Sequence, residues 1–293
     1  MAKYKKTRRQ HYVPKVYLKF FSRRKKNNYY ISVIDKDKDS FFTVNIENIA
    51  CCNYFYEVNT KTENYWEMYY SKNIESSLPS IFNNLIAGAT LSQNNTNILS
   101  ENAKKEMSKI ILSQISRTRK SKEFYSNIEN NIKLQFMNTI SKESDYELSI
   151  AQKEILDKIM HNNDLIRDIE LTTVNSKKLL DKGTQCLMDK IWIIYKNLNY
   201  KICPFITSDH PVVYYNILNS KTDLESNGIA LNSTIIQYPI NSQLLLVLYP
   251  RHIFFGKLQQ FDNKIIHIKE NNFVLRVDKL QYEQCYKQVY YTF

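Results

Sequence analysis

The spacing of hydrophobic residues changes twice along the chain, and each spacing predicts a different secondary structure. Residues 29–34 and 41–46 alternate between apolar and polar positions around a Lys-Asp-Lys-Asp-Ser turn, which predicts a β-hairpin. Residues 54–58 have the composition of a third strand. Ahead of the hairpin, Pro14 opens an apolar stretch, and this predicts a short helix over about 14–21 because proline is favoured at a first helical position.

The middle of the chain has helical spacing. Apolar residues recur three and four apart from Trp66 to Leu85, which marks one buried face of a helix. Ser100 is a suitable N-cap for a second helix, whose inner positions continue to Ile115. Further helices are predicted over about 121–140, 147–160 and 163–182.

From Lys190 onward, short β-rich runs separated by turn residues replace the helical pattern. The predicted strands are 191–195, 202–207, 212–215, 233–237, 244–249 and 264–268, followed by a helix near 278–287. We therefore expect one α+β domain over 1–293, in which the N-terminal hairpin joins a mostly antiparallel C-terminal sheet beneath a central helical layer. Its parts are a basic segment and hairpin (1–60), a helical part (61–188) and a β-rich part (189–293).

The composition excludes several classes of protein. A chain of 293 residues with 43% hydrophobic residues can bury a core, so wholesale disorder is excluded. Only 4 Gly and 6 Pro argue against collagen-like and linker-rich architectures. No apolar run approaches a membrane span, and the five Cys form no C-x-x-C pair. We therefore do not expect a membrane protein, a disulfide scaffold or a structural zinc site. We expect a cytoplasmic location.

The positive charge is concentrated at one end of the chain. Of the 41 Lys and Arg residues, 11 lie within residues 1–34, which contain no acidic residue. The remaining chain is almost neutral, with 30 basic and 29 acidic residues. A basic block of this kind attracts polyanions, so nucleic acid is the expected partner. The alternative is a basic tail that is simply solvated.

His11 is the first candidate for chemistry. Neutral histidine can move a proton near pH 7, and His11 lies in the most basic stretch of the chain, between Gln10 and Tyr12 and close to Lys15. Neighbouring cations lower the pKa of a histidine and favour its neutral form. The alternative is a histidine packed near a helix start.

Asp209 is the second candidate. Ser208, Asp209 and His210 lie between two apolar runs, where strand ends commonly present side chains at a cleft. The alternative is a turn in which Asp209 accepts hydrogen bonds from nearby backbone amides.

The helical part contributes two acids and an arginine. Glu67 and Glu75 are eight residues apart and project in similar directions from one helix, where paired carboxylates can hold Mg²⁺ or orient a histidine. We expect Glu67 to be a solvated residue at the helix flank. Arg117 continues the inner face of the next helix and needs an anion, which is either Glu75 or a ligand phosphate.

Several well-known sites are absent from the sequence. There is no P-loop, no G-x-G-x-x-G and no G-x-S-x-G, which excludes the standard NTPase, Rossmann and α/β-hydrolase interpretations. No Cys has the local context of a nucleophile.

Two motifs indicate a family. Residues 10–14 (Gln-His-Tyr-Val-Pro), together with 17–21 (Tyr-Leu-Lys-Phe-Phe), resemble the opening signature of the uncharacterised bacterial domain of unknown function 4238, and 205–212 (Phe-Ile-Thr-Ser-Asp-His-Pro-Val) resemble its second hallmark. Glu67 and Glu75 match its helix with spaced acids.

Other elements of that family are present in altered form. Arg117-Thr118 matches an Arg-Thr-Pro element, although Arg119 stands where Pro is usual. Tyr238-Pro239-Ile240 is similar to a Pro-Leu-Ser-Pro turn, and Val277-Asp278 stands where Leu-Asn is common. The resemblance implies a shared single-domain α+β fold with these polar residues gathered into one site, and it implies no reaction.

A histidine, two carboxylates and an arginine suit phosphodiester chemistry. The leading hypothesis is a nuclease-like effector that attacks RNA or DNA, as a toxin or in phage defence. His11 would be the general acid or base, Arg117 would stabilise charge on the phosphate, and Glu75 and Asp209 would orient His11 or bind a divalent metal such as Mg²⁺. The expected substrate contacts are Gln10, Tyr12, Lys15 and Ser208.

Two alternatives remain open at this point. One is a nucleic-acid-binding module without catalysis, in which the same polar residues form a buried structural network. The other is an enzyme that acts on a nucleotide such as NAD. The sequence does not determine the oligomeric state.

Overall fold

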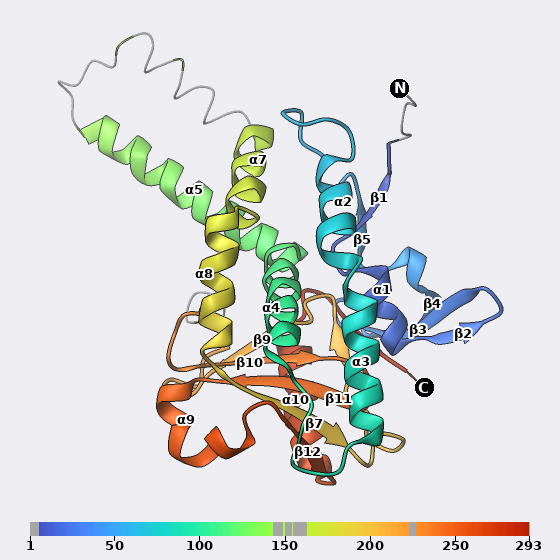
Figure 1. The fold of residues 1–293 in the computed structure, drawn as a ribbon. Coiled ribbons are helices and arrows are strands. Elements are labelled where there is room, and N and C mark those ends of the chain that lie inside the picture. Colours follow the sequence, from blue (N-terminus) through green and yellow to red (C-terminus); the bar gives the residue numbers. More distant parts are fainter. Residues whose placement is uncertain (1–5, 143–148, 150–153, 155–162, 223–226, 293) are drawn as a thin grey trace.

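The structure is a computed structural model that describes residues 6–142, 149, 154, 163–222 and 227–292. Helices stand side by side above a sheet built from the C-terminal part of the chain, and a hairpin arm built from the N-terminal part projects from the body (Figure 1). The predicted α+β class is confirmed.

The N-terminal hairpin belongs to a five-stranded sheet. Its strands are β2 (Arg23–Lys25), β3 (Asn28–Asp35), β4 (Ser40–Asn45), β8 (Thr207–Ser208) and β13 (Gln288–Tyr291). β3 is central: it pairs with β4 on one edge and with β2 and β13 on the other, and β13 pairs with β8. The predicted hairpin is confirmed, and it joins the C-terminal part of the chain through β13.

A two-stranded ladder lies beside this sheet. β1 (Arg9–His11) pairs with β5 (Cys51–Asn53), and a 3₁₀ turn over Ile46–Asn48 precedes β5. The predicted strand at 54–58 is wrong. Tyr54 has a φ of 53°, in the left-handed region, so the chain turns directly after β5 instead of continuing as a strand.

The C-terminal part forms a six-stranded sheet with the order β6-β12-β7-β11-β10-β9. β12 and β7 pair in parallel, and the other strand pairs of this sheet, among the residues that the structure describes, are antiparallel. The strands are β6 (Thr96–Asn97), β7 (Ile191–Asn197), β9 (Val213–Asn216), β10 (Thr234–Pro239), β11 (Leu244–Tyr249) and β12 (Lys264–Ile268). Five of the six predicted C-terminal strands are therefore confirmed.

The six-stranded sheet is covered on both faces. Along β11, Leu244, Leu246 and Leu248 pack into the main core, whereas Leu245 and Val247 pack with α10 (Asn271–Gln284) on the other side. Two buried faces explain why β11 reads as an unbroken apolar run and not as an alternating one.

Several boundaries differ from the predictions. The predicted strand at 202–207 is wrong except for its last residue, because a turn and Pro204 occupy most of it. The C-terminal helix, α10, begins seven residues before the predicted start. The strand β13, the helix α9 (Arg251–Leu258) and the 3₁₀ turn at Gln259–Phe261 were not predicted.

The helical layer follows the predicted pattern with two exceptions. Its elements are α1 (Lys15–Leu18) with a 3₁₀ turn at Lys19–Phe21, α2 (Tyr65–Tyr70), a π-helical turn (Ser71–Glu75), α3 (Leu78–Leu91), α4 (Glu101–Ser116), α5 (Arg119–Lys142), α7 (Asn163–Val174) and α8 (Lys177–Met188). The hydroxyl of Ser100 caps α4 as predicted, accepting from the Ala103 amide at 3.2 Å.

The predicted helix over 163–182 is instead two helices. Ser176 is extended and its hydroxyl accepts from the Leu179 amide, which caps the start of α8. The predicted helix over 147–160 lies almost wholly outside the described residues.

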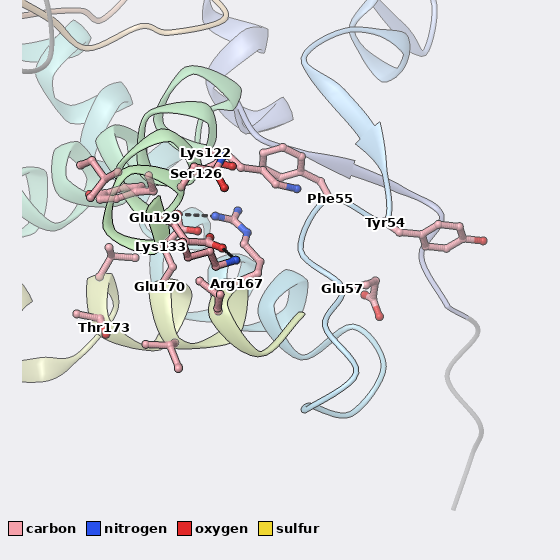
Figure 2. Close-up of a pocket in the computed structure, with 16 residues that line it drawn as sticks. Tyr54, Phe55, Glu57, Lys122, Ser126, Glu129, Lys133, Arg167, Glu170 and Thr173 are labelled. Carbon is pink, nitrogen blue, oxygen red and sulfur yellow. Dashed lines mark ion pairs between the residues drawn. The ribbon is translucent and has the colours of Figure 1, made fainter. Parts of the chain in front are cut away.

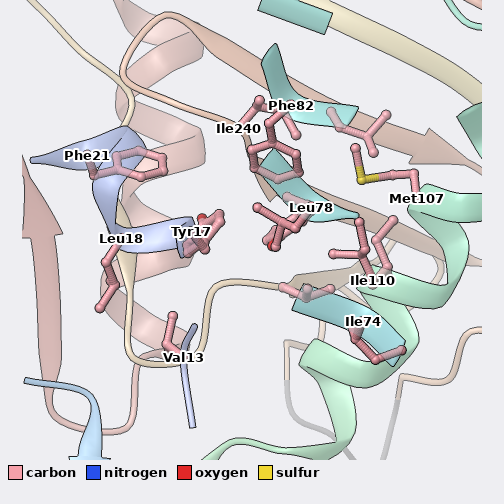
Figure 3. Packing of buried hydrophobic residues seen from close by; sticks show 14 of the residues in the cluster. Val13, Tyr17, Leu18, Phe21, Ile74, Leu78, Phe82, Met107, Ile110 and Ile240 are labelled. Carbon is pink, nitrogen blue, oxygen red and sulfur yellow. The ribbon is translucent and has the colours of Figure 1, made fainter. Parts of the chain in front are cut away.

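The main core joins all three predicted parts of the chain. Tyr17 and Phe21 come from the N-terminal segment, Leu78 and Phe82 from α3, and Ile240 from the β-rich part, and all are buried (Figure 3). The Tyr17 ring stacks on Tyr238 at 5.2 Å between ring centroids. This shared core holds the N-terminal strand β1 against the helices that carry the candidate acids.

Candidate functional site

Arg117 connects two other predicted site residues, Glu75 and His11. It follows α4 and is 1% exposed. Its Nη1 forms an ion pair with Glu75 at 2.8 Å, and its Nη2 donates to the backbone carbonyl of His11 at 2.7 Å. Its Nε donates to the Tyr56 hydroxyl at 2.9 Å. Of the two anions that the sequence left open for Arg117, the structure places Glu75 against it.

Two tyrosines enclose the guanidinium. Its central carbon lies 4.4 Å from the ring centre of Tyr70 and 5.6 Å from that of Tyr56. Aromatic faces stabilise a cation that is removed from water. Because Arg117 is enclosed and its partners are protein groups, it has no exposed surface to offer a phosphate, and its geometry is that of a positioning residue.

The π-helical turn brings Glu67 and Glu75 onto one side. A π-helical turn contains about one residue more than an α-helical turn, so the separation of eight positions between the two acids corresponds to about two full turns. The Glu67 side chain thereby lies close enough to Arg117 and Glu75 for both to act on its charge. Single π-helical turns occur frequently at functional sites.

Glu67 differs from the solvated residue that we expected. Its Oε2 is buried and has no hydrogen-bond partner among the described residues. Burial raises the pKa of Glu67 to about 7, Arg117 opposes the rise, and the negative charge of Glu75 adds to it. The expectation was wrong because the fold partly buries this helix flank, which helical spacing alone does not reveal.

His11 lies near Glu75 and is 7% exposed. Its Nε2 is 3.3 Å from the carbonyl oxygen of Ile46, which can only accept, so Nε2 carries the proton and Nδ1 the lone pair in the neutral ring. The pKa of His11 is lowered as expected, although burial is the main cause and Lys15 contributes less. Glu75 is near enough to raise it in part.

Gln10 links the cluster to a neighbouring loop. It is fully buried, its Nε2 donates to Glu57 Oε1 at 2.7 Å, and its Oε1 accepts from the Tyr56 amide at 2.6 Å. Gln10 therefore fixes the loop that supplies the Tyr56 hydroxyl to Arg117, and this use of its amide is structural.

A pocket of about 820 Å³ opens on the far side of this loop, between α5 and α7 (Figure 2). Phe55 and Glu57 form one wall, and Arg167 reaches across it from α7. Arg167 forms an ion pair with Glu170 at 2.5 Å, and Lys133 forms one with Glu129 at 2.5 Å. The pocket is thus lined by balanced charges on a mostly apolar wall.

Two other predicted contacts differ in exposure. The Lys15 side chain is 43% exposed and pairs with Glu47 at 2.9 Å, so it lies at the surface next to His11. Tyr12 is 5% exposed, and its ring packs 5.4 Å from that of Phe55. Lys15 is accessible to a substrate, whereas Tyr12 belongs to the core.

Asp209 is held by backbone amides. Its Oδ1 accepts from the amide of Tyr286 at 2.7 Å, and its Oδ2 accepts from those of Lys287 at 2.8 Å and Gln288 at 3.0 Å. Burial raises the pKa of Asp209 to about 6, and the three amides act in the opposite direction. This carboxylate anchors the start of β13, with amides that are distant in sequence from Asp209.

The neighbours of Asp209 are also engaged within the protein. The Ser208 hydroxyl donates to Gln281 Oε1 at 2.8 Å. His210 is 1% exposed, its Nδ1 lies 2.8 Å from the Thr118 hydroxyl, and burial lowers its pKa to about 3. Ser208, Asp209 and His210 therefore join β8, β13, α10 and the start of α5.

The structure joins Arg117 to Glu75 and to the backbone of His11, and it places Glu67 near Arg117 and Glu75. Asp209 and Ser208 have other partners in the fold. The tyrosines Tyr56 and Tyr70, which enclose Arg117, were not singled out from the sequence. The sequence pattern that could have pointed to one of them is the apolar stripe from Trp66 to Leu85, which contains Tyr70.

A metal centre is not formed by these residues. Within the part of the chain that the structure describes, no three His, Cys, Asp or Glu side chains converge in a way that could hold a metal ion. The two acids of the cluster are bound to or near Arg117, whose charge opposes a cation there. Magnesium therefore does not fit this cluster.

The comparisons with known proteins bear on the family. The model of a protein family of unknown function (DUF4238) matches residues 9–292. The chain belongs to this family. No curated protein and no solved structure matches it. The family model begins at the strand that carries His11 and ends within one residue of β13, so it includes the whole cluster described above.

One further finding concerns membranes. No helix in the described ranges has both the length and the hydrophobicity that crossing a lipid bilayer requires.

Proposed function

We propose that the chain is a nuclease-like protein that hydrolyses phosphodiester bonds of RNA or DNA, with Glu67 as the group that transfers protons. The observation that carries the proposal is the half-buried Glu67 carboxyl group, which has a pKa of about 7 and one oxygen without a hydrogen-bond partner in the described part of the chain. Perturbed carboxyl groups of this kind are concentrated at active sites, because an acid or base works best when its pKa is near the working pH.

In the proposed step, Glu67 both accepts the proton and returns it. Ionised Glu67 takes a proton from the attacking water while the new P–O bond forms. Protonated Glu67 then returns that proton to the leaving sugar oxygen as the old P–O bond breaks. Both forms are populated near pH 7.

The surrounding residues have supporting roles. Neutral His11 offers Nδ1 as an acceptor that orients the water, and Arg117 holds the His11 backbone and Glu75 in place. Exposed Lys15, whose charge acts on Glu67, is a surface cation that can bind a phosphate. In this assignment Asp209 anchors β13 and takes no part in the reaction.

Activity assays with matched variants test the proposal. End-labelled RNA, single-stranded DNA and duplex DNA are incubated with the wild-type protein, Glu67→Gln, His11→Ala and Glu63→Gln, the last being an exposed control four residues away. We expect Glu67→Gln to lose roughly 100-fold or more in rate and Glu63→Gln to retain the wild-type rate. Equal rates for Glu67→Gln and wild type would refute the proposal.

The same assay decides between the alternatives. Binding of nucleic acid without cleavage would favour the non-catalytic module, in which the Arg117 network is structural only. Cleavage of NAD with intact RNA and DNA would favour a nucleotide-directed enzyme. We extend the proposal to a toxin or phage-defence role, since cleavage of cellular nucleic acid stops growth. Induced wild type, but not Glu67→Gln, should then arrest a bacterial culture.

A further inference from the structure

One face of the five-stranded sheet carries aromatic and basic side chains together. In an antiparallel sheet, residues directly opposite each other point to the same face. Arg23 lies opposite Tyr30, Tyr291 lies opposite Ser32, and Phe41 lies opposite Ile34. Since Tyr30, Ser32 and Ile34 alternate along β3, they share one face. We call this the outer sheet face, and its aromatic and basic members are Arg23, Lys25, Tyr30, Phe41 and Tyr291.

The opposite face packs on the core. Ile31, Val33 and Tyr290 point to that side and are buried in the main hydrophobic cluster. The outer sheet face therefore points away from the core. Phe41 is 69% exposed, and Tyr30 and Tyr291 are partly exposed.

A helix covers part of the outer sheet face and leaves the hairpin end open. α10 packs over β8, where Ser208 bonds to Gln281. The three consecutive strands β2, β3 and β4 project beyond the body of the protein (Figure 1). Because Phe41 is exposed on a projecting hairpin, packing in the core does not explain why an aromatic residue stands at this position.

The charged strand residues of the outer sheet face are basic, whereas the turn between β3 and β4 carries both Lys and Asp. Arg23 and Lys25 are exposed on this face, and the β2, β3 and β4 residues that share it include no Asp or Glu. Asp35 lies on β3 but points to the other face. A positive, aromatic sheet surface matches the chemistry of an unpaired nucleic acid strand, whose bases stack on rings while its phosphates meet cations.

The three rings lie on three adjacent strands. Tyr30 is on β3, Tyr291 is on β13 opposite Ser32, and Phe41 is on β4 opposite Ile34, so the rings are spread both along β3 and across it. An extended chain that crosses the strands can stack its bases on more than one of these rings. In a duplex the bases stack on one another and are not free to stack on a protein ring.

We propose that the outer sheet face binds single-stranded nucleic acid, with bases stacked on Tyr30, Phe41 and Tyr291 and phosphates held by Arg23 and Lys25. This proposal shares its substrate class with the proposed function and rests on it to that extent. It adds the surface and the preference for unpaired strands.

Adjacent residues on opposite faces supply matched variants. Phe41→Ala removes a ring from the outer sheet face, whereas Phe42→Ala removes the next ring, which points to the other side and is 39% exposed. Arg23→Gln and Arg24→Gln form the same kind of pair, since Arg24 lies opposite Tyr29. Simple attraction to a basic segment would affect both arginines equally.

Fluorescence anisotropy with a labelled oligouridylate of roughly ten nucleotides measures the effect. The measurement uses the full chain carrying Glu67→Gln, so that the probe is not cleaved. We expect Phe41→Ala to weaken binding about tenfold and Arg23→Gln about threefold to fivefold, with Phe42→Ala and Arg24→Gln within twofold of the parent. A duplex RNA of the same length should bind at least tenfold more weakly.

Each outcome gives a decision. Equal losses for Phe41→Ala and Phe42→Ala, equal losses for the two arginines, or equal affinity for duplex and single strand would overturn the assignment to the outer sheet face. Circular dichroism confirms that each variant is folded, and Lys25→Gln provides a second exposed substitution if Phe41→Ala is not.

The two proposals fail separately. If the outer-face variants weaken binding while Glu67→Gln cleaves at the wild-type rate, the nuclease chemistry is wrong and the binding face stands. If Glu67→Gln abolishes cleavage while all the face variants bind normally, the binding face is wrong and the chemistry stands.

Discussion

The burial of Glu67 should make the stability of this protein fall as the pH rises. An unfolded Glu67 has a pKa near 4.5, whereas in the folded protein it is about 7. Between these values the folded protein holds a proton that the unfolded chain has released. The free energy of unfolding therefore decreases by about 1.4 kcal/mol for each pH unit in this window, and Glu67 causes no further change above it.

The size of the effect follows from the two pKa values. From about pH 5 to about pH 8 the integrated decrease is about 2.5 kcal/mol, and we expect about 2 kcal/mol because water partly reaches the side chain. Glu67→Gln removes the titration while keeping the shape. Relative to wild type, the variant should gain about 2 kcal/mol of stability on going from the acidic to the alkaline end of this range.

Urea unfolding at several pH values measures this difference. Trp66 and Trp192 are 4% and 0% exposed, so their fluorescence reports loss of the core. Glu63→Gln is the control and should follow wild type at every pH, because Glu63 is exposed. If the difference between Glu67→Gln and wild type changes by less than about 0.5 kcal/mol over the range, Glu67 is not buried as described, and the proton-transfer role loses its basis.

Two further predictions separate anchoring from catalysis. Asp209→Asn replaces one of two accepting oxygens by an NH₂ group, which would face backbone amides that also donate. The free energy of unfolding, measured in urea, should therefore fall by about 3 kcal/mol. A fall of less than about 1 kcal/mol would contradict an anchoring role for Asp209. Arg117→Lys should lower the free energy of unfolding by about 3 kcal/mol or more, because one ammonium group cannot reach Glu75, the Tyr56 hydroxyl and the His11 carbonyl together. An unchanged melting temperature would show that these contacts do not stabilise the fold.

Local patterns in the sequence predicted much of the fold. The hairpin was predicted because alternation and a turn are properties of neighbouring residues, and the same is true of the Ser100 cap and of the apolar stripe that begins at Trp66. The inward position of Arg117 followed from three- and four-residue spacing along α4. The sequence also singled out its anion, Glu75, as one of two possibilities.

The tertiary structure decided which polar groups share an environment. The pKa of Glu67 is raised because the fold buries its carboxyl group and places the negative charge of Glu75 nearby, although Arg117 acts in the opposite direction. Asp209 is an anchor because the amides of residues 286–288 approach it from the far end of the chain. Desolvation and long-range hydrogen bonds depend on which segments meet in three dimensions. The spacing of residues along a segment predicts the faces and turns of that segment. It does not predict which other segments pack against those faces.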